Sequence, residues 1–330
     1  MIFDNMMFHG VEEIEKCEDG YLLWRLPSSI RKEVNEGIRT LTSRYGTGIE
    51  IRFKMKCDTV TLILSAEEMP EANVAHIYYG SIQGGWQNSS KSILGSPTRI
   101  TIQKPENMEF LKGLSKERAL PFSAEVVRVV LPYGKIHYWG VEGEVELPCK
   151  DEMPKKTYLA YGSSITHGSL ALAMPYSYPF RVSQKLGCDY LNMGFAGTAQ
   201  MEKSMAEYLV SRKDWDFATV EMGINMTGDQ FSTESFEKNV DAFTRILAED
   251  PRPVFATNIY GFSDPERQKR GQEYRKIVEK YAKDRLIFVD GLQLLDNPAY
   301  ISQDMVHPSL EGMEEIVNNW CRVLKNSGIV

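Results

Sequence analysis

Two segments of the sequence contain residue types that together can cleave an ester. Ser164 lies in Gly-Ser-Ser-Ile-Thr-His-Gly, a run of small and hydroxyl-bearing residues that follows an apolar stretch. A serine at a strand-to-helix turn can present its hydroxyl to a cleft as a nucleophile. Glycine and serine are also common turn and cap residues, so this segment taken alone leaves both interpretations open.

The second segment is Asp-Met-Val-His-Pro near the C-terminus, with Asp304 and His307 three residues apart. A carboxylate at this spacing in a loop can accept a hydrogen bond from Nδ1 of the histidine, which leaves Nε2 to take the serine proton. The alternative is an aspartate that forms a local turn beside a solvent-facing histidine. His167, three residues after Ser164, is the rival base, but we expect its local geometry to aim it at substrate or solvent.

Two further segments could stabilise the oxyanion that forms when a serine attacks an ester. One is Asn-Met-Gly-Phe-Ala-Gly at 192–197, and the other is Gly-Ile-Asn at 223–225. An open backbone N–H of a glycine and the side-chain amide of Asn225 are suitable donors. The structural alternative is that the glycines only permit tight turns and that Asn225 only caps the next helix.

The elements that must position these residues change character along the chain. From about Thr40 to Leu147 the sequence runs in short alternating or β-branched stretches separated by turn residues, which predicts a β-sandwich, with jelly-roll-like topology as the expected arrangement. A polar stretch from Pro148 to Pro154 indicates a linker. We therefore predict an N-terminal β-sandwich domain over 1–153 and a second domain over 154–330.

The second domain alternates predicted strands with longer helical patterns, which is typical of a parallel, doubly wound α/β sheet. The predicted strands are 157–162, 188–194, 217–223, 253–261 and 286–291. The predicted helices lie near Tyr178–Leu186, Met201–Ser211, Ser235–Ala248, Pro265–Ala282 and Ser309–Leu324. Ligands of such sheets bind beyond the carboxyl ends of the strands, where each of the four segments is placed.

The four segments occur in the order Ser, Gly, Asn, His, and this resembles the SGNH hydrolases, also called the GDSL family. The resemblance covers about Lys155–Val330 and implies a three-layer α/β/α domain with a flavodoxin-like sheet. Carried over residue by residue, it implies Ser164 as the nucleophile, Asp304 and His307 as the rest of the triad, and the N–H of Ser164 with Gly197 and Asn225 as the oxyanion hole.

The sequence departs from the family pattern at two positions. The aspartate that usually precedes the nucleophile is Ser163 here, and the aspartate that often follows the Asn of the third block is Met226. Neither departure removes a triad member. The Gly-Ser-Ser-Ile-Thr variant joined to a β-sandwich looks like a branch of the family that includes carbohydrate esterases.

We therefore expect an esterase that removes a short acyl group, with acetyl preferred, from a carbohydrate or related small ester, and that needs no cofactor or metal. An acyltransferase that uses the same triad is the alternative, as is a carbohydrate-binding protein with an inactive hydrolase half. In the N-terminal domain, one interpretation of the aromatic residues is a platform for a sugar ring, and the other is core packing. These aromatic residues are Tyr78, Tyr79, Trp86, Tyr133, Tyr138 and Trp139.

The net charge of -7 and the pI of about 5.5 argue against nucleic acid or an anionic membrane as the main partner. The first residues lack the basic and apolar regions of a secretory signal, so a cytoplasmic location is expected.

The five cysteines form no Cys-x-x-Cys pair, and we expect them to be reduced. The sequence is also compatible with a homo-oligomer, because a domain rich in strands can present exposed strand edges that pair with a second copy.

Overall fold

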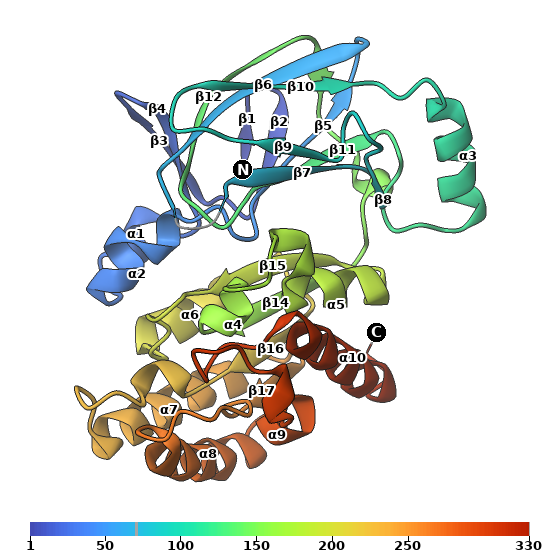
Figure 1. The fold of residues 1–330 in the computed structure, drawn as a ribbon. Helices are drawn as coiled ribbons and strands as arrows, with labels where there is room; N and C mark the ends of the chain where they lie inside the picture. Colours follow the sequence, from blue (N-terminus) through green and yellow to red (C-terminus); the bar gives the residue numbers. More distant parts are fainter. Residues whose placement is uncertain (70–71, 330) are drawn as a thin grey trace.

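Two antiparallel sheets form a β-sandwich at the N-terminal end of the chain. The computed structural model describes residues 1–69 and 72–329, and Figure 1 shows the sandwich above the α/β part of the molecule. The first sheet has the order β1-β2-β5-β11-β7-β8, with β13 paired to β5 and β9 paired to β7. Its strands are β1 (Ile2–Phe3), β2 (Met6–His9), β5 (Glu50–Met55), β7 (Val74–Tyr79), β8 (Ile82–Gln83), β9 (Ser90–Ser92), β11 (Val126–Val130) and β13 (Val145–Glu146).

The second sheet of the sandwich has the order β10-β6-β12-β4-β3. Its strands are β3 (Glu13–Cys17), β4 (Gly20–Trp24), β6 (Thr59–Ala66), β10 (Thr98–Gln103) and β12 (Ile136–Glu142). Inward-facing residues of both sheets, among them Phe53 of β5 and Leu62 of β6, are fully buried in one shared core. The predicted β-sandwich is confirmed.

A third sheet of five parallel strands follows, in the order β15-β14-β16-β17-β18. The strands are β14 (Thr157–Gly162), β15 (Asp189–Gly194), β16 (Phe217–Glu221), β17 (Val254–Thr257) and β18 (Ile287–Val289). The helices of this part are α4 (Ser164–His167), α5 (Tyr178–Leu186), α6 (Lys203–Ser211), α7 (Thr233–Ala248), α8 (Gln268–Lys283), α9 (Gly291–Leu294) and α10 (Leu310–Asn326). All five predicted strands and all five predicted helices are present, with bounds shifted by a few residues.

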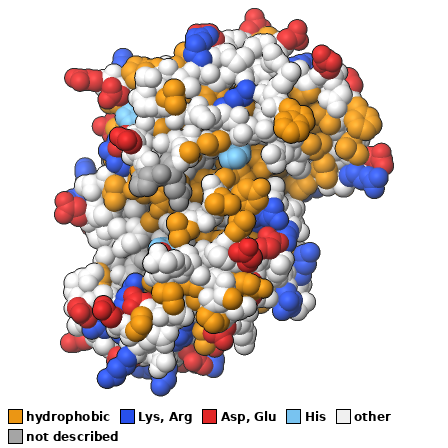
Figure 2. Space-filling model, in the orientation of Figure 1, with side chains coloured by type: hydrophobic (Ala, Val, Ile, Leu, Met, Phe, Trp, Pro, Cys, Tyr) orange, Lys and Arg blue, Asp and Glu red, His pale blue; other side chains and the backbone are white. Residues whose placement is uncertain are grey.

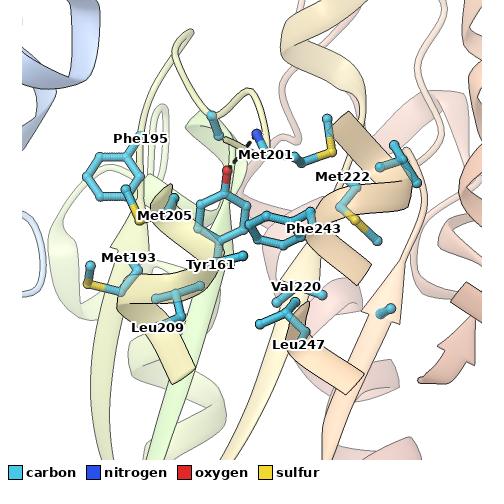
Figure 3. Packing of buried hydrophobic residues seen from close by; sticks show 14 of the residues in the cluster. Tyr161, Met193, Phe195, Met201, Met205, Leu209, Val220, Met222, Phe243 and Leu247 are labelled. Carbon is cyan, nitrogen blue, oxygen red and sulfur yellow. Dashed lines mark hydrogen bonds between the residues drawn. The ribbon is translucent and has the colours of Figure 1, made fainter. Parts of the chain in front are cut away.

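Both faces of the parallel sheet are covered, because successive side chains of a strand point to opposite faces. Leu159 and Tyr161 of β14 pack in the cluster that includes α6, α7 and α8. Their neighbours Tyr158 and Ala160 pack in the cluster formed with α5 and α10. Figure 3 shows the first cluster around the Tyr161 ring, whose hydroxyl accepts a hydrogen bond from the Met201 N–H at 3.0 Å. The predicted three-layer α/β/α fold is confirmed.

Helices also occur in the N-terminal part, where the sequence predicts only strands. The helix α3 (Met108–Glu117) lies between β10 and β11, and α1 (Ser28–Arg31) and α2 (Glu36–Thr40) precede β5. Met108 and Leu111 are three residues apart and pack on the sandwich core, so the apolar spacing of α3 is helical. No helix in the described part of the chain is both long and apolar enough to span a membrane.

Buried arginines join the sandwich to β15, the edge strand of the parallel sheet. Arg52 of β5 forms a bidentate ion pair with Asp189 at 2.6 and 2.7 Å and also bonds Glu50 at 2.8 Å. Burial raises the pKa of Asp189, but the attraction of Arg52 outweighs it and holds the pKa well below its usual range. The carboxylate of Asp189 is therefore charged at neutral pH.

We predict that Asp189→Ala lowers the free energy of unfolding by about 3 to 5 kcal/mol, because it leaves the Arg52 charge buried with one partner fewer. Urea unfolding followed by fluorescence measures the change. The difference between wild type and variant should shrink as the pH falls below about 4, since a carboxylate with a lowered pKa stabilises the fold above its unfolded pKa and loses this effect on protonation.

The matched control is Glu142→Ala, which breaks a bidentate pair with Arg99 on the exposed surface of the same sandwich. We expect no measurable change in its unfolding midpoint, because solvent screens such pairs. An equal loss of unfolding free energy in Asp189→Ala and Glu142→Ala would contradict the expectation that the buried pair stabilises the fold more than the exposed pair does.

Candidate active site

The strand-end residues predicted from the sequence meet in one place. Ser164 is the first residue of α4, directly after β14, and its side chain is nearly buried at 8% exposure. Its Oγ lies 2.7 Å from Nε2 of His307. Nδ1 of His307 lies 2.6 Å from Oδ2 of Asp304. The three side chains therefore form a continuous hydrogen-bonded chain from hydroxyl to imidazole to carboxylate.

The loop before α10 is built to hold Asp304 against His307. Oδ1 of Asp304 accepts the backbone N–H groups of Val306 and His307, each at 2.9 Å, and the hydroxyl of Ser302 at 2.7 Å. Met305 has a φ of 63°, in the left-handed region, which lets the chain turn back within three residues. Partial burial on its own would raise the pKa of Asp304. These hydrogen bonds and that of the His307 ring outweigh this effect and hold the pKa well below its usual range.

A charged Asp304 fixes the tautomer of His307. The carboxylate is an acceptor only, so Nδ1 must carry the ring proton. Nε2 is then the acceptor for the Ser164 hydroxyl, which is the arrangement that a general base requires.

The predicted oxyanion donors lie beside the Ser164 hydroxyl in the same cleft. Among the described residues no acceptor is found for the backbone N–H of Ser164 or of Gly197. The side-chain amide of Asn225 donates one hydrogen bond, of 3.3 Å, to the carbonyl of Phe195 and keeps a second N–H. Gly197 has a φ of 71° and open space where a Cβ would stand, so backbone conformation rather than space favours glycine there.

His167 is placed away from the serine hydroxyl. Its ring is fully buried and packs against Tyr133 and Tyr45 at centroid distances of 4.6 and 5.3 Å. Nδ1 accepts the N–H of Ala196 at 3.2 Å. Burial, aided by the charge of Arg25, lowers the pKa of His167 well below its usual value. His167 thus supports the loop after β15, and the expectation that it points to substrate or solvent is wrong.

A buried carboxylate under the nucleophile is the main feature that the sequence did not reveal. Oε2 of Glu221, at the end of β16, accepts the N–H and the hydroxyl of Ser163 at 2.9 and 2.8 Å and the hydroxyl of Thr166 at 3.0 Å. A Cβ on Gly162 would lie 2.6 Å from this oxygen, so the carboxylate fits only beneath a glycine. Glu221 supplies a carboxylate next to position 163, where the family pattern has aspartate and this chain has serine.

The cleft above Ser164 has a volume of about 620 Å³ and receives residues from both parts of the chain. Tyr133 comes from the sandwich, and its hydroxyl lies 2.9 Å from Oγ of Ser169. Arg267, Gln230 and Val306 also line the cleft. Arg267 holds the loop that carries Asn225, through bonds of 2.7 Å to the Ile224 carbonyl and the Thr227 hydroxyl.

Of the two interpretations of the aromatic residues, the structure favours core packing over a platform for a sugar ring. Tyr78, Tyr79 and Tyr138 are buried side chains of the sandwich. Trp139 donates its ring N–H to Ser65, and the fully exposed Trp86 lies in a separate surface groove. Of the six aromatic residues, only Tyr133 lines the cleft at Ser164. The reason is strand alternation, which directs neighbouring aromatic side chains to opposite faces of a sheet.

The described residues include no cluster of three or more His, Cys, Asp or Glu side chains that could hold a metal ion. All five cysteines are free.

Known proteins resemble this chain in sequence over part of its length and in fold over nearly all of it. Residues 160–315 match the family model of the GDSL-like lipases and acylhydrolases. The C-terminal part of the chain is therefore similar to this family over just under half of the chain length. A search of curated proteins gives no match to this chain.

Solved structures share the whole two-part fold of this chain at low sequence identity. A salicylyl-acyltransferase from a tetracycline biosynthetic pathway has a TM-score of 0.76 and 14% identity, covering 99% of this chain and 96% of its own. A family two carbohydrate esterase from Clostridium thermocellum, solved in complex with cellohexaose, has a TM-score of 0.63 and 11% identity, with coverages of 98% and 100%. An acetyl xylan esterase from the rumen bacterium Butyrivibrio proteoclasticus has a TM-score of 0.58 and 12% identity, with coverages of 100% and 98%.

The Glu221 arrangement leads to a prediction about catalysis. Glu221→Ala should lower kcat about 100-fold with little change in KM, because a nucleophile displaced by about 1 Å loses roughly that factor. Glu221→Gln should keep most of the activity, since one amide oxygen can accept the same three hydrogen bonds. Steady-state kinetics with p-nitrophenyl acetate, alongside circular dichroism to confirm folding, measures both. A Gln variant as impaired as the Ala variant would show that the negative charge, rather than the hydrogen bonds, is required.

Proposed function

We propose that the protein is a serine esterase that removes a short acyl group from a hydroxyl-rich alcohol such as a carbohydrate. The observation that carries the proposal is the hydrogen-bonded chain from Ser164 through His307 to Asp304, with links of 2.7 and 2.6 Å. The match of residues 160–315 to the GDSL-like lipase and acylhydrolase model supports the hydrolase class. The carbohydrate esterase and the acetyl xylan esterase among the structural neighbours support a carbohydrate as the alcohol and acetyl as one of the acyl groups.

In the proposed reaction Ser164 Oγ attacks the ester carbonyl carbon while Nε2 of His307 takes the hydroxyl proton. The carbonyl oxygen becomes an oxyanion, which the N–H groups of Ser164, Gly197 and Asn225 stabilise by about 3 kcal/mol each. The bond to the alcohol oxygen then breaks, and His307 returns its proton to that oxygen. The alcohol leaves and the acyl group stays on Ser164.

Water completes the cycle. His307 takes a proton from a water molecule that attacks the acyl-enzyme, and a second oxyanion forms in the same hole. Collapse of this intermediate breaks the bond to Ser164, which regains its proton from His307. The products are the carboxylic acid and the regenerated enzyme.

An acyltransferase is the second candidate, because one structural neighbour that covers nearly the whole chain is a salicylyl-acyltransferase. The first half of the reaction would be identical, and an acceptor alcohol would replace water in the second half. Product analysis in the presence of added sugar alcohols separates the two, since a hydrolase releases free acid and a transferase a new ester. A carbohydrate-binding protein without activity fits less well, because the whole triad is assembled.

The Ser164→Ala variant tests the proposed function. We expect a loss of about 10⁴- to 10⁶-fold in kcat on p-nitrophenyl acetate and on acetylated xylo-oligosaccharides, since removal of the nucleophile leaves only binding and the oxyanion hole. Ser211→Ala, on the exposed end of α6, is the control and should keep full activity. Activity that survives in Ser164→Ala would contradict the assignment of the nucleophile.

A further inference from the structure

A small side pocket opens next to the cleft at Ser164. Its volume is about 180 Å³, and its walls come from both parts of the chain. The lining residues are Met69, Ala72, Asn73, Tyr133, Gly134, Ser169 and Leu170. Tyr133 and Ser169 line both the pocket and the cleft, so the two spaces adjoin each other.

The pocket is apolar. Of the side chains that the structure describes around it, none is charged. Asn73 donates one hydrogen bond to the Glu67 carbonyl at 3.1 Å, and Ser169 is bonded to Tyr133. Hydrophobic side chains also gather along the boundary between the sandwich and the α/β/α part, while charged side chains lie mainly toward the outer edges of this face (Figure 2). The pocket therefore suits a hydrocarbon group rather than a sugar hydroxyl.

Leu170 is held at the pocket in an unusual backbone conformation. Leu170 has a φ of 61° and remains 40% exposed, and Leu172 has a φ of 63° and is 74% exposed. This region is unfavourable for leucine, and such strain persists only where the surroundings impose it. The loop is tied to the nucleophile, because the Ser169 N–H donates to the Ser164 carbonyl at 3.0 Å. Of the two leucines, only Leu170 lines the pocket.

The chemistry of the triad decides which half of an ester enters this pocket. His307 must return a proton to the leaving alcohol, so the alcohol has to lie on the His307 side of Ser164. His307 lines the cleft and does not line the side pocket. The cleft also carries the polar side chains of Gln230 and Arg267, which suit a hydroxyl-rich alcohol. The apolar side pocket is then left for the acyl group.

The size of the pocket limits that acyl group. An apolar cavity of about 150 Å³ accepts benzene, and this pocket is slightly larger at about 180 Å³. An acetyl methyl would leave most of it empty. We propose that the pocket binds the hydrocarbon part of an acyl group between butyryl and benzoyl in size, so that esters of such acids are better substrates than acetates. This inference rests on the proposed esterase function and names its acyl substrate class.

The test measures kcat/KM for p-nitrophenyl acetate, butyrate and benzoate with the wild type, Leu170→Ser and Leu172→Ser. We expect the wild type to prefer butyrate or benzoate over acetate. Leu170→Ser should lose about tenfold on the two larger esters and much less on acetate, because an apolar wall is removed. Leu172→Ser is the matched control, an exposed leucine in the same backbone conformation that does not line the pocket, and should behave as the wild type.

A second series keeps the acetyl group and varies the alcohol from ethyl to phenyl and benzyl. If Leu170→Ser changes this series instead of the acyl series, the pocket binds the alcohol and the inference is overturned. A wild type that cleaves acetate but neither larger ester overturns it as well, as do equal losses in the two leucine variants, and both results leave the esterase function standing. A folded wild type that cleaves none of these esters would instead refute the proposed function.

Discussion

The attachment of the edge strand β15 to the β-sandwich is the interaction on which the rest of the site depends. Arg25 of the sandwich is fully buried, and its guanidinium donates to the carbonyls of Asn192 and Gly194 on β15 and of Thr42. Among the residues that the structure describes it pairs with no carboxylate, and burial lowers its pKa to about 9. A buried cation of this kind is tolerated only when carbonyl oxygens replace water around it. Together with Arg52 at Asp189, it closes the edge of the sheet.

This attachment places both walls of the substrate site. The loop that follows β15 carries Gly197, so the carbonyls held by Arg25 lie immediately before one of the proposed oxyanion donors. The same packing brings Tyr133 of the sandwich over Ser169, next to the nucleophile. The sandwich therefore contributes a wall of the cleft and most of the side pocket, which gives a physical reason for its presence beside the hydrolase fold.

Much of the site could be predicted from the sequence because each of its blocks is local. Ser164, Gly197, Asn225 and His307 each follow a strand or precede a helix, and parallel strands bring their carboxyl ends to one edge. Once the topology is that of a doubly wound sheet, these residues must converge. The Asp304 and His307 pair needs only three residues of chain to form.

The parts that escaped prediction depend on contacts between distant segments. Glu221 is one residue of a buried strand, and the residues beside it in the sequence do not indicate that its carboxylate accepts a hydrogen bond from Ser163, 58 residues away. The approach of Arg25 to β15 spans 167 residues. The side pocket needs loops of both parts at once, and α3 was missed because its short amphipathic pattern lies between strands. Such features follow from tertiary packing, which a local pattern does not encode.

The most direct test of the account is mass spectrometry of the enzyme quenched in acid during turnover of p-nitrophenyl butyrate, followed by peptide mapping. The account predicts one added butyryl group per chain, located on Ser164 and absent from Ser164→Ala. A butyryl group on another residue, or rapid turnover of the ester by an enzyme that never carries one, would contradict it.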